Sequence, residues 1–215
     1  MARSTIGRED AKLRSAAMPA DSGPVAAVLL AAGSSSRFGS PKMLARVGGE
    51  ALLRRVARSF LEAGFADVVV VLAPDAPDVA AALDGLPVRT VVNPCPADGM
   101  LSSAQAGLAA LAGGPERVAL TPADIPGLTA PVLRTLLVAL PPADAASIDV
   151  PACGSRRGHP IVLPAALVTR VLAWERGRRL SDVLREPGVV VREHGGFGAE
   201  VLRDVDVPSD LTAGG

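Results

Sequence analysis

An unbroken apolar run opens residues 25–42, which read VAAVLLAAGSSSRFGSPK. A run with no polar residue on either face is typical of a strand buried within a parallel sheet. The run ends at Gly33, and a loop rich in Gly and Ser follows it. In open parallel sheets, ligands bind just beyond the carboxyl ends of the strands. This stretch therefore predicts an α/β fold with a ligand-binding loop after its first strand.

The loop carries two cations, Arg37 and Lys42. Gly lets backbone N–H groups approach a ligand closely, an Arg forms a planar fork to phosphate oxygens, and a Lys adds a compact charge. Lys12 and Lys42 are the only lysines among the 22 basic residues, so a Lys in this loop is unlike ordinary surface charge in this chain. The composition of the loop predicts a polyphosphate site in preference to a solvated surface loop.

Neither of the two commonest phosphate-binding fingerprints fits this loop. A P-loop needs Gly-Lys followed by Ser or Thr, whereas Pro41 precedes Lys42 and Met43 follows it. A dinucleotide fingerprint needs Gly-x-Gly-x-x-Gly directly after the strand, and no such spacing follows Leu30.

The loop instead resembles the signature LAAGxSxRxGxxK of nucleotidyltransferases with a molybdenum cofactor guanylyltransferase-like domain. The match is without a gap and covers Leu30, Ala31, Ala32, Gly33, Ser35, Arg37, Gly39 and Lys42. The resemblance implies catalytic roles for Arg37 and Lys42. It also implies a nucleotide site formed by Leu30, Ala31, Ala32, Gly33, Ser34, Ser35, Arg37 and Lys42.

Strand and helix patterns alternate through the rest of the chain, which predicts one doubly wound, mostly parallel sheet with helices on both faces. The resemblance implies a Rossmann-like, glycosyltransferase-A-like nucleotidyltransferase domain at residues 24–212, after a disordered tail at 1–23. Helices are expected at residues 50–63, 78–83, 104–111, 165–174 and 181–184, and from residue 129. Further strands are expected at residues 68–73, 88–93, 118–120, 149–152, 161–163, 189–191 and 201–205.

Residues 93–108, NPCPADGMLSSAQAGL, form the second motif. Ser102 or Ser103 can cap the helix expected at residues 104–111, and a helix N-terminus with hydroxyl groups also suits an anion. The pattern GMxSSxxxGL resembles the same family, in which this segment lies beside the nucleotide. Helix capping and nucleotide binding both remain open for these serines.

Two carboxylates follow expected strands. Asp124 lies in TPADIPGL, where Pro122 and Pro126 hold the chain extended on either side, and Asp206 lies in the closing stretch DVDVPSDL. In the family that these motifs resemble, the corresponding aspartates hold the catalytic Mg²⁺. Mg²⁺ prefers a few carboxylates together with substrate phosphates. The resemblance thus implies a metal site at Asp124 and Asp206 and a catalytic role for Asp124.

A turn at GSRRGHP brings Arg156, Arg157 and His159 together, and it is similar to the family's acceptor-side loop. The resemblance implies that these residues bind the acceptor, although a solvated turn also tolerates the arginines and a lone His is more often structural than a proton shuttle. Cytidylyltransferases of the molybdenum cofactor usually carry GDxGAR farther on. This chain has WERGRRL there and lacks the Gly-Asp pair.

Composition excludes several classes of function. The formal net charge is zero, which argues against a nucleic-acid or anionic-membrane surface. No run of about 18 apolar residues exists, so no membrane-spanning helix is expected. Cys95 and Cys153 lack metal-ligand spacing and predict a reduced, cytoplasmic protein. Aromatic residues make up 2% of the chain and Tyr is absent, so the core must consist mainly of Ala, Val and Leu.

These observations predict a Mg²⁺-dependent nucleotidyltransferase that releases pyrophosphate. The AAG form of the loop is closer to cytidylyltransferases than the AGG form typical of guanylyltransferases, so the resemblance implies CTP as nucleotide. It also implies molybdopterin as acceptor and a molybdenum hydroxylase or its maturation factor as partner. Sugar-phosphate, isoprenoid-precursor or phospholactate acceptors remain alternatives, as do a cofactor chaperone and a nicotine-pigment reductase.

Overall fold

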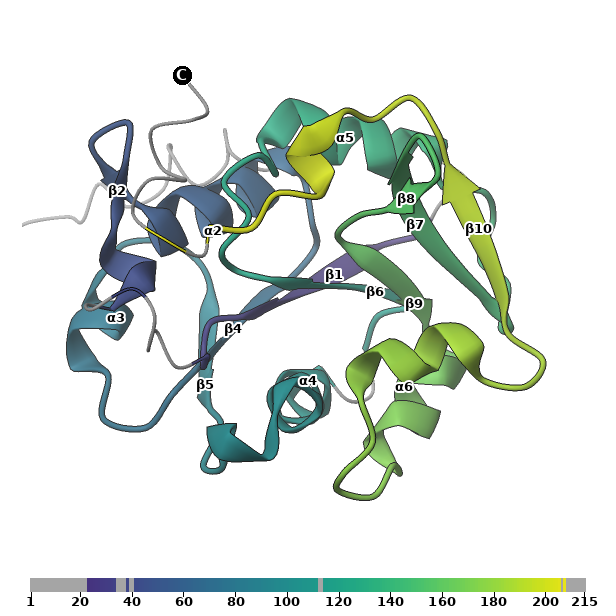
Figure 1. The fold of residues 1–215 in the computed structure, drawn as a ribbon, viewed down its shortest axis with the longest axis horizontal. Coiled ribbons are helices and arrows are strands. Elements are labelled where there is room, and N and C mark those ends of the chain that lie inside the picture. The colour runs from purple at the N-terminus through teal and green to yellow at the C-terminus, as the bar shows by residue number, and fades with distance from the viewer. Residues whose placement is uncertain (1–22, 34–37, 39–40, 112–113, 206, 208–215) are drawn as a thin grey trace, which may run out of the picture.

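A computed structural model describes residues 23–33, 38, 41–111, 114–205 and 207. These residues form one main sheet with helices on both faces (Figure 1), in the strand order β10-β7-β9-β6-β1-β4-β5, with β8 paired to β7. Strand β9 runs antiparallel to both of its neighbours, β7 and β6. The other neighbouring pairs along this order are parallel: β10 with β7, β6 with β1, β1 with β4, and β4 with β5. The predicted doubly wound, mostly parallel sheet is confirmed.

The strands of the main sheet are β1 Val25–Leu30, β4 Val68–Leu72, β5 Arg89–Val92, β6 Arg117–Pro122, β7 Ser147–Cys153, β8 Arg156–Arg157, β9 Ile161–Pro164 and β10 Val190–His194. The helices are α2 Leu52–Ala63, α3 Pro77–Ala81, α4 Met100–Ala110, α5 Ala130–Ala139 and α6 Ala165–Leu172. Short 3₁₀ helices occur at η1 Lys42–Leu44, η2 Pro96–Asp98, η3 Leu180–Arg185 and η4 Ala199–Val201.

Strand β1 shows why helices cover both faces of the sheet. Because successive side chains of a strand point to opposite faces, Val25, Ala27 and Leu29 pack with α2 and α5, while Val28 and Leu30 pack with α4 and α6. Figure 1 shows α2 and α5 above the sheet and α4 and α6 below it. The uninterrupted apolar run is therefore needed to fill two cores at once.

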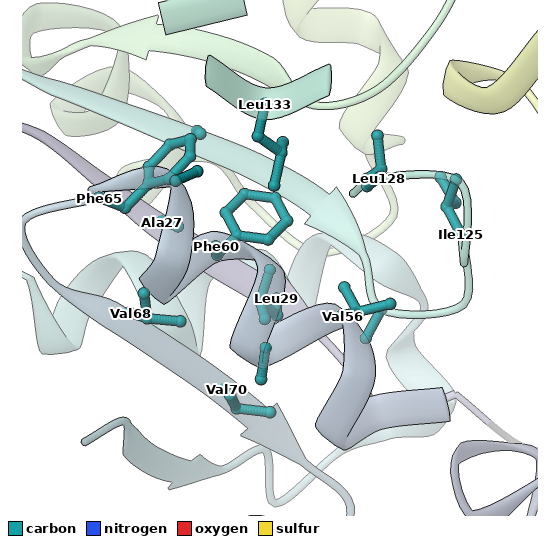
Figure 2. Close-up of a cluster of buried hydrophobic side chains, with 14 of the residues drawn as sticks. Ala27, Leu29, Val56, Phe60, Phe65, Val68, Val70, Ile125, Leu128 and Leu133 are labelled. Carbon is teal, nitrogen blue, oxygen red and sulfur yellow. The ribbon is translucent and has the colours of Figure 1, made fainter. Parts of the chain in front are cut away.

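The core under α2 anchors the loop that follows β6. Figure 2 shows Phe60 of α2 among aliphatic side chains, with Ile125 and Leu128 entering the same cluster from that loop. Ile125 is 1% exposed and Leu128 is completely buried. Each such side chain contributes about 1.5–3 kcal/mol when fully buried. The loop is consequently held in place by the core although it has no regular secondary structure.

Two glycines form the turn that leads into α2. Gly48 and Gly49 have φ angles of 60° and 85° and connect β2, Arg46–Val47, to β3, Glu50–Ala51, in an antiparallel hairpin. Positive φ at both central positions is the backbone that tight hairpins require and that Gly adopts without strain. The hairpin delays the start of α2 to Leu52, and Gly64, with φ of 98°, ends the helix as predicted.

Gly107 permits α4 to lie directly on the sheet. A Cβ atom at this position would lie 2.4 Å from Cγ1 of Val28 and 2.7 Å from Cγ2 of Val71. Normal carbon–carbon contacts are about 3.5–4.0 Å, so no larger side chain fits without moving the helix. The last part of the motif at residues 93–108 therefore has a packing function.

Three sequence predictions are wrong in detail. Residues 201–205 are not a strand, because Val201 ends η4 and Val205 donates its N–H to the Asp124 carbonyl instead of to a strand. Their apolar spacing reflects burial, since Val201 and Val205 are at most 1% exposed. The helix expected at 181–184 is the 3₁₀ helix η3, and the one expected at 104–111 already begins at Met100.

The connections define where ligands can bind. From β1 the chain runs through α2 to β4 and through α3 to β5, and then returns through α4 to β6 on the other side of β1. The carboxyl ends of β1 and β6 thus flank the point at which the strand order reverses, which is the usual ligand site of open α/β sheets. Within the described residues, no helix is long and apolar enough to cross a membrane.

Candidate active site

The ends of β1 and β6 lie side by side. Leu30 pairs with Pro122, and the N–H of Ala123 donates to the Leu30 carbonyl at 3.0 Å. Ala31 and Ala32 are 5% and 2% exposed and pack into the two opposite cores. Their side chains therefore point into the protein interior. The backbone of the next residue, Gly33, is exposed and can contact a ligand.

Asp124 follows β6 immediately and is held from both sides. Its neighbours Ala123 and Ile125 are 0% and 1% exposed, and both belong to the core under α2. One carboxylate oxygen, Oδ2, accepts a hydrogen bond from Lys42 Nζ at 2.6 Å. The other oxygen, Oδ1, is buried and has no hydrogen-bond partner among the described residues. Such an oxygen is an unsatisfied acceptor that a ligand can use.

Lys42 reaches Asp124 from the end of the Gly/Ser loop. It is the first residue of η1, and the next residue, Met43, is 7% exposed and packs into the core. The Ala45 N–H donates to the Lys42 carbonyl at 3.0 Å and closes the short turn. The side chains of Lys42 and Asp124 are only 14% and 16% exposed. The ammonium and the carboxylate therefore form a largely desolvated ion pair at the point where β1 and β6 end.

The side chains at this point supply some, but not all, of the ligands that a hard divalent cation needs. Asp124 offers one unpartnered carboxylate oxygen, which is the ligand type that Mg²⁺ and Mn²⁺ prefer. No group of three or more His, Cys, Asp or Glu able to hold a metal ion occurs within the described residues. Mg²⁺ does not require such a group, because it keeps several waters and takes one or two carboxylates with substrate phosphates.

His159 lies in the loop between β8 and β9. Its backbone N–H donates to the Val201 carbonyl at 2.8 Å, and its ring Nδ1 is buried without a hydrogen-bond partner in the described structure. Burial lowers the pKa of His159, and the negative charges of Asp124 and Asp204 oppose this shift without reversing it. The imidazole is therefore neutral at pH 7. Its predicted role in acceptor binding stays a prediction.

Arg157, which precedes this loop, has its partner elsewhere. Arg156 and Arg157 form β8 and are exposed, and Arg157 Nε donates to Glu193 Oε1 of β10 at 2.7 Å. The structure thus joins Arg157 to the edge of the sheet rather than to the pair of Lys42 and Asp124. Acceptor binding by these arginines stays a prediction.

Ser102 and Ser103 surround a buried amide that sequence reasoning did not select. Asn93 is 2% exposed, and its Nδ2 donates to both serine hydroxyl oxygens at 2.9 Å. Ser102 Oγ also lies 2.8 Å from the carbonyl oxygen of Gly99, the residue at the N-cap position of α4. The predicted helix cap is therefore wrong, because both serines lie inside the helix. The only signal for Asn93 was its position at the end of the strand expected at residues 88–93.

The stretch WERGRRL connects α6 to η3 and packs beside α4. Gln105 Nε2 donates to the carbonyls of Val171 and Trp174 at 3.0 and 2.9 Å, and the Arg178 guanidinium lies 3.7 Å from the centre of the Trp174 ring. Arg176 pairs with Asp98 of η2 at 3.2 Å. This stretch is thus attached to the motif at residues 93–108.

Four of the predicted site residues lie outside the described part of the chain: Ser34, Ser35, Arg37 and Asp206. Their roles in nucleotide and metal binding stay predictions, as does the disordered tail at residues 1–23, of which only Gly23 is described.

Two solved structures resemble the fold closely. A nucleotidyl transferase from a Methanothermobacter species aligns with a TM-score of 0.74 at 24% identity, over 88% of this chain and 94% of the other. A Mycobacterium tuberculosis protein in complex with manganese aligns with a TM-score of 0.71 at 24% identity, over 88% and 96% of the two chains. At this identity the likeness concerns the fold alone.

Sequence relatives have two different names. The chain is 37% identical over 165 residues to nicotine blue oxidoreductase of Paenarthrobacter nicotinovorans, covering 73% of this chain and 80% of the relative. It is 35% identical over 197 residues to a probable molybdenum cofactor guanylyltransferase of Deinococcus radiodurans, covering 87% and 92%. The family model described as the MobA-like NTP transferase domain matches residues 27–193. With its sheet, its loop after β1 and this match, the chain belongs to the family of MobA-like NTP transferase domains.

Proposed function

We propose that this protein transfers a nucleoside monophosphate from a nucleoside triphosphate to the terminal phosphate of molybdopterin, with a divalent cation and release of pyrophosphate. The observation that carries the proposal is the desolvated pair of Lys42 and Asp124 at the ends of β1 and β6. The family supports nucleotidyl transfer, and the name of the Deinococcus relative supports the acceptor.

The chemistry of this pair suits an in-line displacement at phosphorus. An oxygen of the acceptor phosphate forms a bond to the α-phosphorus, and the bond from that phosphorus to the pyrophosphate oxygen breaks. No side-chain nucleophile is needed, so the protein contributes mainly positioning and positive charge. Lys42 supplies an ammonium group at the strand end, and Asp124 keeps one carboxylate oxygen available there. When bound at that oxygen, Mg²⁺ would neutralise charge that develops on the phosphate oxygens.

Two nucleotides compete for this assignment. The AAG form of the loop, Ala31, Ala32 and Gly33, favours CTP. The name of the Deinococcus relative, a probable molybdenum cofactor guanylyltransferase, favours GTP. CTP is the nucleotide we propose, and GTP is the second candidate.

A reductase is the other candidate, because the Paenarthrobacter relative is named nicotine blue oxidoreductase. The fingerprint Gly-x-Gly-x-x-Gly, which would bind a dinucleotide at the first strand, does not follow Leu30. The transferase is therefore the stronger proposal.

The test measures pyrophosphate release with each of the four nucleoside triphosphates, with Mg²⁺ or Mn²⁺ and with molybdopterin as acceptor. We expect release with CTP, and its loss in Asp124→Asn, because the amide offers no charge to the cation. Asp84→Asn, which changes an exposed carboxylate after α3, is the control and should keep full turnover.

A preference for GTP would change the proposed nucleotide from CTP to GTP and would leave the proposed reaction unchanged. Absence of release with all four triphosphates, together with reduction of nicotine blue by NADH or NADPH, would overturn the transferase in favour of the reductase.

A further inference from the structure

The loops that carry Asp124 and His159 are joined by a third segment, residues 199–205, which we call the C-terminal clamp. The His159 N–H donates to the Val201 carbonyl at 2.8 Å, and the Val205 N–H donates to the Asp124 carbonyl at 2.9 Å. The clamp thus binds the backbone of both residues. Asp124 follows β6, whereas His159 precedes β9, so the two loops come from different strands.

Two glycines allow the clamp to approach these loops. A Cβ atom on Gly127 would lie 2.5 Å from the carbonyl oxygen and 2.8 Å from the Cα of Glu200. A Cβ atom on Gly158 would lie 2.6 Å from both the carbonyl oxygen and Cγ2 of Val201. Most of these obstacles are backbone atoms, which cannot rotate away as the end of a flexible side chain can.

Backbone conformation does not explain why Gly occupies either position. Gly127 and Gly158 are not among the positive-φ glycines, unlike Gly48 and Gly49 of the hairpin. An Ala would adopt the same φ and ψ at both positions without strain, so the need for Gly is the contact with the clamp. Each glycine lies within three residues of a side chain at the site.

The core holds the clamp itself. Val201 and Val205 are 0% and 1% exposed and belong to the cluster that contains Ile125 and Leu128. The same packing therefore fixes the clamp and the loop of Asp124. A displacement of the clamp at Gly127 or Gly158 must move at least one of these loops, because the backbone hydrogen bonds connect them.

We propose that the clamp is a positioning element of the transfer reaction and that Gly127 and Gly158 are positioning residues that admit it. The clamp sets where the carboxylate of Asp124 stands relative to Lys42 and to the imidazole of His159. This inference rests on the proposed function, since it concerns the reaction for which that geometry is needed.

The test uses Gly127→Ala and Gly158→Ala in the full chain. Relieving a contact of about 2.5 Å toward the normal 3.5–4.0 Å requires a shift of about 1 Å. A misplacement of that size in a catalytic site costs on the order of 10² in rate. We therefore expect kcat for pyrophosphate release to fall about 10²-fold. The affinity for the nucleotide, measured by calorimetry, should change far less, because the loop after β1 is untouched.

Three further alanine variants separate positioning from stability. Val168→Ala removes methyl groups from the core on the opposite face of the sheet, where Val168 of α6 is buried, so it should lower the melting temperature and leave kcat unchanged. Gly195→Ala adds a methyl group where no atom lies within 4 Å and should change neither. Val201→Ala loosens the clamp without adding atoms, and it should lower kcat even if an alanine at Gly127 or Gly158 prevents folding.

The outcomes are distinct. If the parent protein turns over and the folded clamp variants lose stability but keep kcat within about twofold, as Val168→Ala should, the clamp is only structural and this inference is overturned. If the parent protein releases no pyrophosphate with any nucleotide, the proposed function fails, and the positioning role fails with it.

Discussion

Lys42 and Asp124 meet through one short, poorly hydrated contact, which makes each of them sensitive to the loss of the other. Removing one partner of a buried ion pair leaves an uncompensated charge, whereas an exposed pair contributes little. Under the proposed function, Lys42 would bind phosphate oxygens of the nucleoside triphosphate and Asp124 would bind the cation. The fold keeps both groups at one point, where β1 and β6 end.

Lys42→Ala should lower kcat by on the order of 10² to 10³, the range expected when one preorganised stabilising group is removed. Negative charge shifts to the leaving pyrophosphate as the bond breaks, and the compact ammonium can follow it. Lys42→Arg should restore only part of the rate, because the planar guanidinium has a different geometry. Steady-state kinetics of pyrophosphate release would show this. A rise in KM at constant kcat would instead mean that Lys42 binds substrate and transition state equally.

His159 should make stability depend on pH. Its pKa is lowered in the folded protein by burial, so the unfolded chain binds more protons as the pH falls. The stability contributed by the neutral ring is complete above the unfolded pKa of about 6.5 and is lost as the pH falls toward the lower folded pKa. The free energy of unfolding from urea titrations should therefore decline less in His159→Gln between about pH 6.5 and 5. An identical decline in both proteins would show that His159 does not carry this dependence.

At the scale of elements, a buried charge network fixes the edge of the sheet. Asp149 of β7 is 1% exposed and accepts hydrogen bonds from Arg192 at 2.8 and 2.9 Å, while His194 Nε2 lies 2.8 Å from its Oδ1. Arg117 of β6 is also buried, and burial lowers its pKa while Asp149 opposes the shift. His194 thus contacts Asp149 at the end of β10.

Asp149→Asn should cost about 3–5 kcal/mol of stability, because it leaves the charge of Arg192 without its carboxylate partner. Glu193→Gln is the matched control on the same strand, since its pair with Arg157 is exposed and should contribute less than about 1 kcal/mol. Denaturant unfolding of both variants measures the difference. Similar losses in the two variants would show that burial does not decide the strength of these pairs.

Elements with one dominant signal could be predicted from the sequence. The strands β1 and β4 are apolar throughout because both of their faces are buried, and Gly64 marks the end of α2. Residues 201–205 read VLRDV and begin and end with a buried valine, yet they belong to the clamp, because burial alone does not distinguish a strand from an anchored irregular segment. Their partners, Gly127 and Gly158, became recognisable only when the distances to the clamp were known.

The sequence predicts which residues of the site could carry the chemistry better than it predicts which side chains contact one another. Asp124 was selected because it follows a strand, and it lies at that position. Its pairing with Lys42 depends on how β1 and β6 are ordered in the sheet, which no local pattern contains. Arg157 was grouped with His159 because they are close in sequence, but the pairing of β8 with β7 directs the arginine to Glu193.

At the scale of the whole molecule, the nucleotide and the cation should stabilise the fold together, because the site proposed for both includes the loop of Asp124, which the core anchors. A ligand at 100 times its dissociation constant adds about 2.7 kcal/mol. For a domain of this size, that free energy raises Tm by about 5–10 °C. Thermal unfolding with CTP and Mg²⁺ should show the shift, and a chelator should remove its metal-dependent part. An unchanged Tm with every triphosphate would contradict nucleotide binding.

The placement of Trp174 gives this protein a built-in optical probe. The sequence contains one Trp and no Tyr, so its intrinsic fluorescence comes from a single indole ring. That ring lies under Arg178, and the carbonyl of Trp174 accepts a hydrogen bond from Gln105 of α4. The emission therefore reports how the stretch after α6 is docked on α4, and it is silent about the aliphatic core that holds the rest of the molecule together.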